Sequence, residues 1–235
     1  MLTFSIAAVA AAKGPVADLR VVGAGGKVLD EDSFGVGGKV SIKASPKASC
    51  FGAGSGGSGR KVSVKGATAL GMLIRAAQFT ASLKPVLITD HFIDEFGLGI
   101  CGVGGTVANK KSGWYFKVDH KSSPVGGELA KLHTGDEVLW GFGSYPYPDE
   151  LVLVAPAEAQ ANVPFTVSVF AYDEKGKKTP AAGVTVSGAS GPTDGAGHAT
   201  VTLAAAATLF ASGGGDTPSA REPVCVGGKC PEAAG

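Results

Sequence analysis

Two alternating segments, which together hold both tryptophans of the chain, constrain its fold most strongly. The first is Gly-Trp-Tyr-Phe-Lys-Val-Asp at 113–119, and the second is Thr-Gly-Asp-Glu-Val-Leu-Trp-Gly-Phe-Gly at 134–143. Apolar and polar residues alternate in both, as is typical of strands with one buried face. A large aromatic ring buries on the order of 150–250 Å². We therefore expect Trp114 and Trp140 to lie in the core of one domain.

One amphipathic helix is predicted upstream of these strands. Thr68 is a favourable N-cap residue, and apolar residues follow it at spacings of three and four, which places them on one helix face. These residues are Leu70, Leu73, Ile74 and Ala77. We expect this face to cover the sheet, with both indoles beneath it.

The composition favours a β-rich exported protein. Charged residues make up 17% of the chain and glycine accounts for 37 of 235 residues, so charge is scarce and glycine abundant for a globular protein. The net charge of +1 gives no overall electrostatic attraction to nucleic acids or anionic membranes. We expect neither as a partner.

Four cysteines predict two disulfides, for which three pairings are possible. We favour Cys50–Cys101 and Cys225–Cys230, because each pair lies within one predicted domain. The alternative is four reduced thiols in a cytosolic protein. A zinc site is not expected, since neither pair has Cys-x-x-Cys spacing and no histidine stands at ligand spacing.

The first twelve residues resemble the apolar region of a signal peptide. Ala8-Val-Ala and Ala10-Ala-Ala are candidate cleavage sites, although no basic residues precede the apolar run. A short apolar edge strand is the alternative. The run is too short to span a bilayer, so we predict an extracellular or cell-surface protein without membrane insertion.

The Pro-rich stretch at 145–149 predicts a boundary between two domains. The first would cover 18–144 and the second 150–226, followed by a tail at 227–235. Short alternating segments separated by turn signals follow the boundary, which is typical of a small β-sandwich.

The first domain is similar to a bacterial domain of unknown function related to the C-terminal domain of transcobalamin. Four pieces carry the resemblance in family order: Gly66-Ala-Thr-Ala-Leu-Gly-Met-Leu, Glu95-Phe-Gly-Leu-Gly-Ile, Gly113-Trp-Tyr-Phe-Lys-Val-Asp and Gly135-Asp-Glu-Val-Leu-Trp. The family commonly has Asn at the position of Asp119. The resemblance implies a β-grasp-like fold, with one helix across a mixed sheet. In transcobalamin this domain helps to hold a corrinoid against a helical domain, which has no counterpart here.

The second domain resembles bacterial immunoglobulin-like modules, which are usually spacers or adhesive stalks. The matching pieces are Pro180-Ala-Ala-Gly-Val-Thr-Val and Thr193-Asp-Gly-Ala-Gly-His-Ala-Thr-Val-Thr-Leu. The predicted fold class is therefore β-rich α+β. A β-grasp-like domain, with a mixed sheet and one helix, precedes a small immunoglobulin-like β-sandwich.

Motifs of catalysis and cofactor binding are weak. Two matches to G-x-G-x-x-G, at 52–57 and 97–102, do not open a helix after a strand, as a dinucleotide site requires. The densest polar cluster, Asp90-His91 with Asp94 and Glu95, is interpreted as a surface turn in preference to an acid–base pair. We expect no catalytic residues, cofactor or metal.

A non-enzymatic binding or adhesion protein is the leading functional hypothesis, with an extracellular protein or glycan as partner. The first domain would be the recognition module and the second its spacer. Tyr115 and Tyr145 are the candidate ligand-binding residues, because aromatic side chains suit binding platforms. Capture of a small, corrinoid-like ligand is the alternative, and a hydrolytic enzyme is disfavoured.

Overall fold

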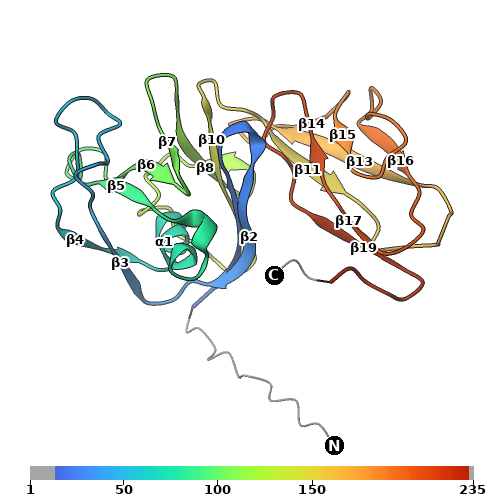
Figure 1. Ribbon diagram of the computed structural model, residues 1–235, viewed down its shortest axis with the longest axis horizontal. Coiled ribbons are helices and arrows are strands. Elements are labelled where there is room, and N and C mark those ends of the chain that lie inside the picture. The colour runs from blue at the N-terminus through green and yellow to red at the C-terminus, as the bar shows by residue number, and fades with distance from the viewer. Residues whose placement is uncertain (1–13, 233–235) are drawn as a thin grey trace, which may run out of the picture.

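The computed structural model describes residues 14–232, so the predicted signal-like segment at 1–12 lies outside the described residues. Within these residues the protein is β-rich, with one α-helix and several sheets, as predicted. Figure 1 shows two lobes side by side, with the residues before 145 in one and those after 149 in the other. Each lobe has its own hydrophobic core. We call them the N-terminal and C-terminal lobes.

The N-terminal lobe is organised around a five-stranded mixed sheet in the order β2-β1-β10-β8-β9. Only the pairing of β1 with β10 is parallel. A parallel pair needs a long crossover, and here the crossover contains the rest of the lobe. The strands are β1 (Val16–Val22), β2 (Val28–Gly35), β8 (Ser112–Val118), β9 (Lys121–Ser122) and β10 (Glu137–Ser144).

A hairpin, one helix and a small antiparallel sheet complete this lobe. The hairpin pairs β3 (Lys39–Lys43) with β4 (Lys61–Lys65). The small sheet holds β5 (Leu87–Thr89), β6 (Gly99–Val103) and β7 (Thr106–Val107). Helix α1 spans Ala69–Phe79, and two short 3₁₀ turns are η1 (Ala24–Gly26) and η2 (Ala81–Leu83).

Helix α1 begins where the sequence predicts. The Thr68 hydroxyl accepts a hydrogen bond from the N–H of Gly71 at 3.1 Å, which is N-cap geometry. Gly71 is required here, because a Cβ at this position would lie 2.0 Å from the carbonyl oxygen of Lys65. The predicted apolar face is buried, and so are Ala69, Met72 and Ala76. The helix is therefore enclosed on more than one side.

The two tryptophans differ in burial. Trp140 is 3% exposed, and its Nε1 donates to the carbonyl of Ala69 at 3.3 Å, so it lies beneath the helix as expected. Trp114 is only half-buried and packs against the core from its margin. The expectation that both indoles lie fully in the core is therefore wrong for Trp114, which lines a cavity.

The C-terminal lobe, as far as residue 232, contains three sets of paired strands around the second core. The largest pairs β13 (Phe165–Tyr172) with β11 (Glu150–Val154), β14 (Lys178–Pro180) and β16 (His198–Val201). A second holds β12 (Glu158–Ala159), β19 (Glu222–Val226) and β17 (Ala207–Leu209). The third pairs β15 (Thr185–Val186) with β18 (Ala211–Ser212). Val167, Val169 and Ala171 alternate into the core, as their spacing predicts. Isolated bridges lie outside these sets, and one of them joins Glu150 to Thr217.

Both disulfides form with the favoured pairing. Cys50 is joined to Cys101, and Cys225 to Cys230. Within residues 14–232, no helix has the length and apolar character needed to cross a membrane.

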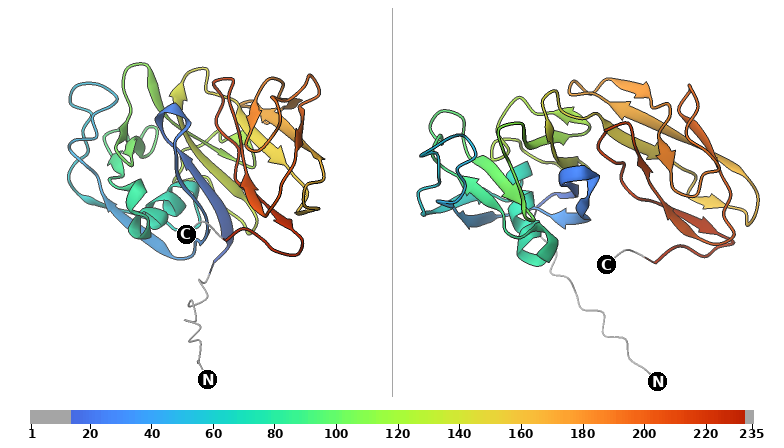
Figure 2. Two further views of the ribbon diagram at one scale, coloured as in Figure 1. Left: turned by 45° about the vertical axis from the view of Figure 1, so that its right-hand side comes forward. Right: turned by 45° about the horizontal axis from the view of Figure 1, so that its top comes forward.

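The main sheet lies between α1 and the C-terminal lobe, and this layering is seen in all three views of Figures 1 and 2. The sheet face turned away from α1 carries the polar positions of the alternating strands. Lys117 is 0% exposed there, and its Nζ donates to the carbonyls of Tyr172 and Asp173 at 2.6 and 3.1 Å. Burial lowers the pKa of Lys117. Strand alternation would place Lys117 in solvent, but its side chain contacts the other lobe.

A buried ion pair joins β1 to β11 across the same interface. The guanidinium of Arg20 donates to the Glu150 carboxylate and to the carbonyl of Pro218. Nδ1 of His120 lies 3.3 Å from Oε1 of Glu150. Burial alone would raise the pKa of Glu150, but contact with His120 and the charge of Arg20 outweigh it and lower that pKa.

Tyr115 fills the interface beside this network. It is 5% exposed, and its hydroxyl lies 2.5 Å from the Thr217 hydroxyl. Burial raises the pKa of Tyr115 to about 12. Gly141 pairs with it across the strands, and a Cβ there would lie 2.4 Å from the tyrosine ring. The ring therefore depends on a glycine opposite it.

Replacing Arg20 by Ala should reduce the free energy of unfolding by about 3–5 kcal/mol, because Glu150 would remain buried without its cation. Chemical denaturation measures this change. Arg221→Ala is the control, since Arg221 forms an ion pair with Glu31 in the same interface but its side chain is 44% exposed. The control should lose at most about 1 kcal/mol. Equal losses in the two variants would contradict the assignment.

The His120 contact predicts a pH-dependent stability. Interaction with Glu150 raises the pKa of His120 above its ordinary value of 6.5, so the folded state favours the protonated ring. The contribution is fully present below pH 6.5 and is lost as pH rises through the folded-state pKa. Unfolding free energies measured between about pH 6 and 9 should fall for the native chain and change less for His120→Gln. Identical profiles would argue against the contact.

Candidate functional site: an aromatic cavity in the N-terminal lobe

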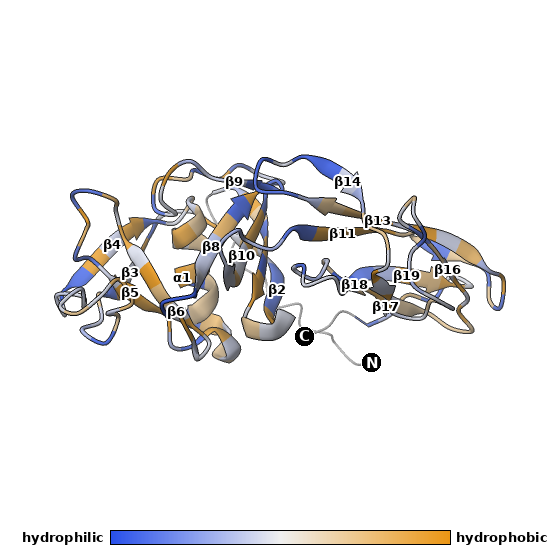
Figure 3. Ribbon diagram, turned by 90° about the horizontal axis from the view of Figure 1, so that it is seen from above, coloured by the Kyte–Doolittle hydropathy of each residue, from blue (hydrophilic) through white to orange (hydrophobic). Residues whose placement is uncertain are grey.

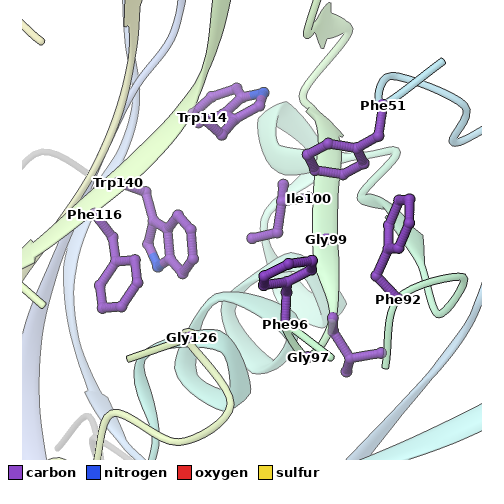
Figure 4. Close-up of a pocket in the computed structure, with 12 residues that line it drawn as sticks. Phe51, Phe92, Phe96, Gly97, Gly99, Ile100, Trp114, Phe116, Gly126 and Trp140 are labelled. Carbon is purple, nitrogen blue, oxygen red and sulfur yellow. The ribbon is translucent and has the colours of Figure 1, made fainter. Parts of the chain in front are cut away.

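An apolar cavity of about 490 Å³ opens beside the main sheet of the N-terminal lobe. Figure 4 shows aromatic rings on its two sides, Trp114, Phe116 and Trp140 on one and Phe51, Phe92 and Phe96 on the other. Its remaining lining residues are Gly97, Leu98, Gly99, Ile100, Gly126 and Gly127. Every lining side chain is aromatic or aliphatic, apart from the glycines, so the cavity suits an apolar ligand group.

The sheet wall follows from strand alternation. Phe116 of β8 pairs with Trp140 of β10, and their rings stack at 4.8 Å. Trp114 is two residues from Phe116 and shares its face. Its Nε1 donates to the carbonyl of Thr106 at 3.2 Å, while that of Trp140 is used by the helix. The two indoles therefore offer the cavity mainly their carbon surfaces.

The opposite wall comes from two loops. Phe92 lies between the other two phenylalanines, with ring centroids 6.0 Å from Phe51 and 6.2 Å from Phe96 in edge-on geometry. Phe51 and Phe96 are 55% and 79% exposed. Cys50, the neighbour of Phe51, is bonded to Cys101 of β6. The disulfide thus ties this part of the wall to the small sheet.

A carboxylate lies behind the glycines of the lining. The N–H of Leu98 donates to Oε1 of Glu128 at 3.1 Å, and Oε2 is buried with no hydrogen-bond partner among the described residues. A Cβ at Gly97 would lie 1.7 Å from Oε1. Gly97 therefore leaves room for the Glu128 carboxylate, which does not itself line the cavity and accepts a hydrogen bond from the loop backbone.

The predicted polar cluster does not line the cavity. Asp90 accepts hydrogen bonds from the N–H and hydroxyl of Ser58, and these bonds lower its pKa. The ring of His91 packs edge-on against Phe92 at 4.5 Å. Asp90 therefore anchors the glycine-rich loop, and His91 supports the loop wall from outside the lining.

The two tyrosines proposed as ligand-binding residues lie away from the cavity. Tyr115 is enclosed in the lobe interface, whereas Tyr145 is 78% exposed. Tyr147 contacts both, stacking on Tyr115 at 4.5 Å and meeting Tyr145 edge-on at 5.9 Å. Of the pair, only Tyr145 offers open surface to a partner, and its binding role stays a prediction.

Sequence reasoning missed the loop wall. Phe96 lies in a turn that precedes β6, which begins at Gly99. A signal was present in the sequence, because Phe51, Phe92 and Phe96 stand in glycine-rich or polar surroundings where exposed aromatic rings need a reason. Their convergence depends on the disulfide and the turn, which spacing does not reveal.

Comparison with protein-family models, curated proteins and solved structures gives no match for this chain. The resemblance to a transcobalamin-related domain accordingly stays a prediction. Among residues 14–232, no group of three or more His, Cys, Asp or Glu side chains is placed to hold a metal ion.

Removing the Cys50–Cys101 disulfide by a double Cys→Ser change should lower the free energy of unfolding by about 4 kcal/mol, because the bond closes a long loop. The matched control is the double change at Cys225 and Cys230, whose sequence separation is 5 instead of 51. The control should lose only about 2 kcal/mol. Denaturant titration of the variants measures both, and a larger loss in the control would contradict the prediction.

Proposed function

We propose that this chain is an exported, non-enzymatic binding protein whose N-terminal lobe takes an apolar, ring-bearing group into the aromatic cavity. The group belongs to a small ligand or to a partner molecule recognised at a cell surface. The C-terminal lobe serves as the spacer that carries this recognition module. Two disulfides support an oxidising compartment.

In this proposal the N-terminal lobe is β-grasp-like and the C-terminal lobe immunoglobulin-like. The first assignment is supported by a single helix packed on a mixed five-stranded sheet. The second is supported by short, mostly antiparallel strands around one core. A fold alone does not establish a function, so the proposed binding function rests on the cavity.

The observation that carries the proposal is the pair of facing aromatic walls. Two loop phenylalanines, Phe51 and Phe96, remain largely exposed. Exposed aromatic rings are unfavourable in water, and a binding site explains why they are there. The volume of about 490 Å³ falls in the range of small-molecule sites. Among residues 14–232, no titratable side chain belongs to the lining, which supports binding over acid–base catalysis. Corrinoid capture rests on the family resemblance alone.

A neutral apolar fluorophore, 1-N-phenylnaphthylamine, tests the cavity directly. Because both tryptophans line it, bound fluorophore should quench their fluorescence. Phe96→Ala should weaken binding by about tenfold through lost ring contact and burial. A titration followed by tryptophan emission measures the dissociation constant.

Phe79→Ala is the matched control. Phe79 is 76% exposed, close to the 79% of Phe96, but it lies at the end of α1 and does not line the cavity. It should leave binding unchanged. Absence of quenching in the native chain, or equal weakening in both variants, would count against the proposal. A coloured complex with hydroxocobalamin would favour the corrinoid alternative.

A further inference from the structure

The stretch of chain that forms the β3–β4 hairpin is basic, although the whole protein is nearly neutral. Residues 33–89 contain no Asp or Glu. The same stretch contains eight basic residues: Lys39, Lys43, Lys47, Arg60, Lys61, Lys65, Arg75 and Lys84. The overall charge of +1 therefore conceals a strong separation of charge along the chain.

The hairpin register gathers four of these lysines on one face. Lys39 pairs with Lys65, and Lys43 pairs with Lys61, with a Ser41–Ser63 pair between them. Alternate residues of a strand point to the same side, so all three pairs share one face. We call this surface the lysine ribbon. All four lysines are exposed, while Val40 and Val64 on the opposite face are buried.

Such a pairing opposes folding. Directly opposed residues on adjacent strands have Cβ atoms about 4.5–5.5 Å apart, and like charges at this distance repel. Within residues 14–232, none of the four lysines forms an ion pair with a carboxylate. Asp90, the first acidic residue after this stretch in the sequence, is hydrogen-bonded to Ser58. The positive charges of the ribbon therefore have no carboxylate partner within the described residues, and an external anion would neutralise them.

From this geometry we infer that the lysine ribbon binds an acidic polysaccharide carrying sulfate or carboxylate groups. The two lysine pairs lie about 13 Å apart along the strands, so a rigid polymer with repeated charges can contact both. The serine hydroxyls between them can hydrogen-bond to sugar hydroxyls or sulfate oxygens. The ribbon lies at the end of the N-terminal lobe away from the C-terminal lobe (Figures 1 and 3), where a long polymer has free access.

Other polyanions fit this face less well. Single-stranded nucleic acids are bound by stacking on aromatic side chains, and base edges are read largely by bidentate arginine, asparagine or glutamine. The ribbon offers only lysine and serine. Amphipathic membrane-surface segments place apolar side chains beside basic ones, whereas Val40 and Val64 of this hairpin are buried on the opposite face. The Cys50–Cys101 disulfide, which ties the loop between β3 and β4 to β6, favours an extracellular ligand.

Dextran sulfate and uncharged dextran of equal length form the matched pair of probes. The native chain should bind dextran sulfate at about 50 mM salt and show no binding to dextran, as measured by isothermal titration calorimetry. The variant with Lys39, Lys43, Lys61 and Lys65 changed to Gln should bind at least about tenfold more weakly. The slope of log affinity against log salt concentration should also become smaller.

The control variant changes Lys110, Lys111, Lys175 and Lys229 to Gln, which removes the same charge from other exposed positions. It should keep its affinity within about twofold. Equal losses in the two variants would mean that net charge alone governs binding, and the ribbon would be rejected. Tighter binding of duplex DNA or of phosphatidylserine vesicles than of dextran sulfate would also overturn the polysaccharide assignment.

Thermal unfolding separates binding from folding. Removing like charges that face each other should leave the midpoint unchanged or raise it. If the fourfold variant unfolds more easily, the pair variants Lys39→Gln/Lys65→Gln and Lys43→Gln/Lys61→Gln replace it, and each should lose part of the affinity. Stable pair variants with native affinity would overturn the inference. This test is independent of the aromatic cavity, since none of the four lysines lines it.

Discussion

The buried ion pair between Arg20 and Glu150 is the interaction on which the arrangement of the whole molecule depends. Charges removed from water are costly unless they are paired and hydrogen-bonded. Here the guanidinium meets a carboxylate from the first strand of the other lobe, and His120 adds a second contact to that carboxylate. Lys117 is anchored to backbone carbonyls across the same interface. These polar contacts fix one orientation of the lobes, because any sliding would leave charges without partners.

The fixed interface decides which surfaces of the N-terminal lobe remain for recognition. One face of the main sheet is covered by α1 and the other by the C-terminal lobe (Figure 2). The surfaces outside this interface include the rim beside the sheet and the hairpin at the far end (Figure 1). The aromatic cavity occupies the first and the lysine ribbon the second. One loop, between β3 and β4, connects them, because it carries Phe51 into the cavity wall and Cys50 into the disulfide.

Much of the fold could be predicted from local pattern. The N-cap at Thr68, the buried face of the helix and the alternation of β8 and β10 are set by interactions within a few residues. The cysteine pairing could also be anticipated, because each pair lies within one lobe. The cavity could not be predicted from the sequence, since its two walls come from loops and strands far apart in the chain. Trp114 shows the limit of prediction from strand alternation. Alternation places its ring on the apolar face of β8 but does not distinguish a core position from the wall of a cavity.

By itself, the sequence determined which residues alternate, where the helix begins and how the basic residues are distributed, since these are properties of neighbours along the chain. Only the tertiary structure decided that the polar face of β8 is covered. Lys117 and Tyr115 have the spacing of solvent-facing residues, yet they are buried because a second lobe packs there. Alternation specifies two faces of a strand but not what lies against each face. That depends on shape and charge complementarity between distant segments, which is settled when the lobes come together.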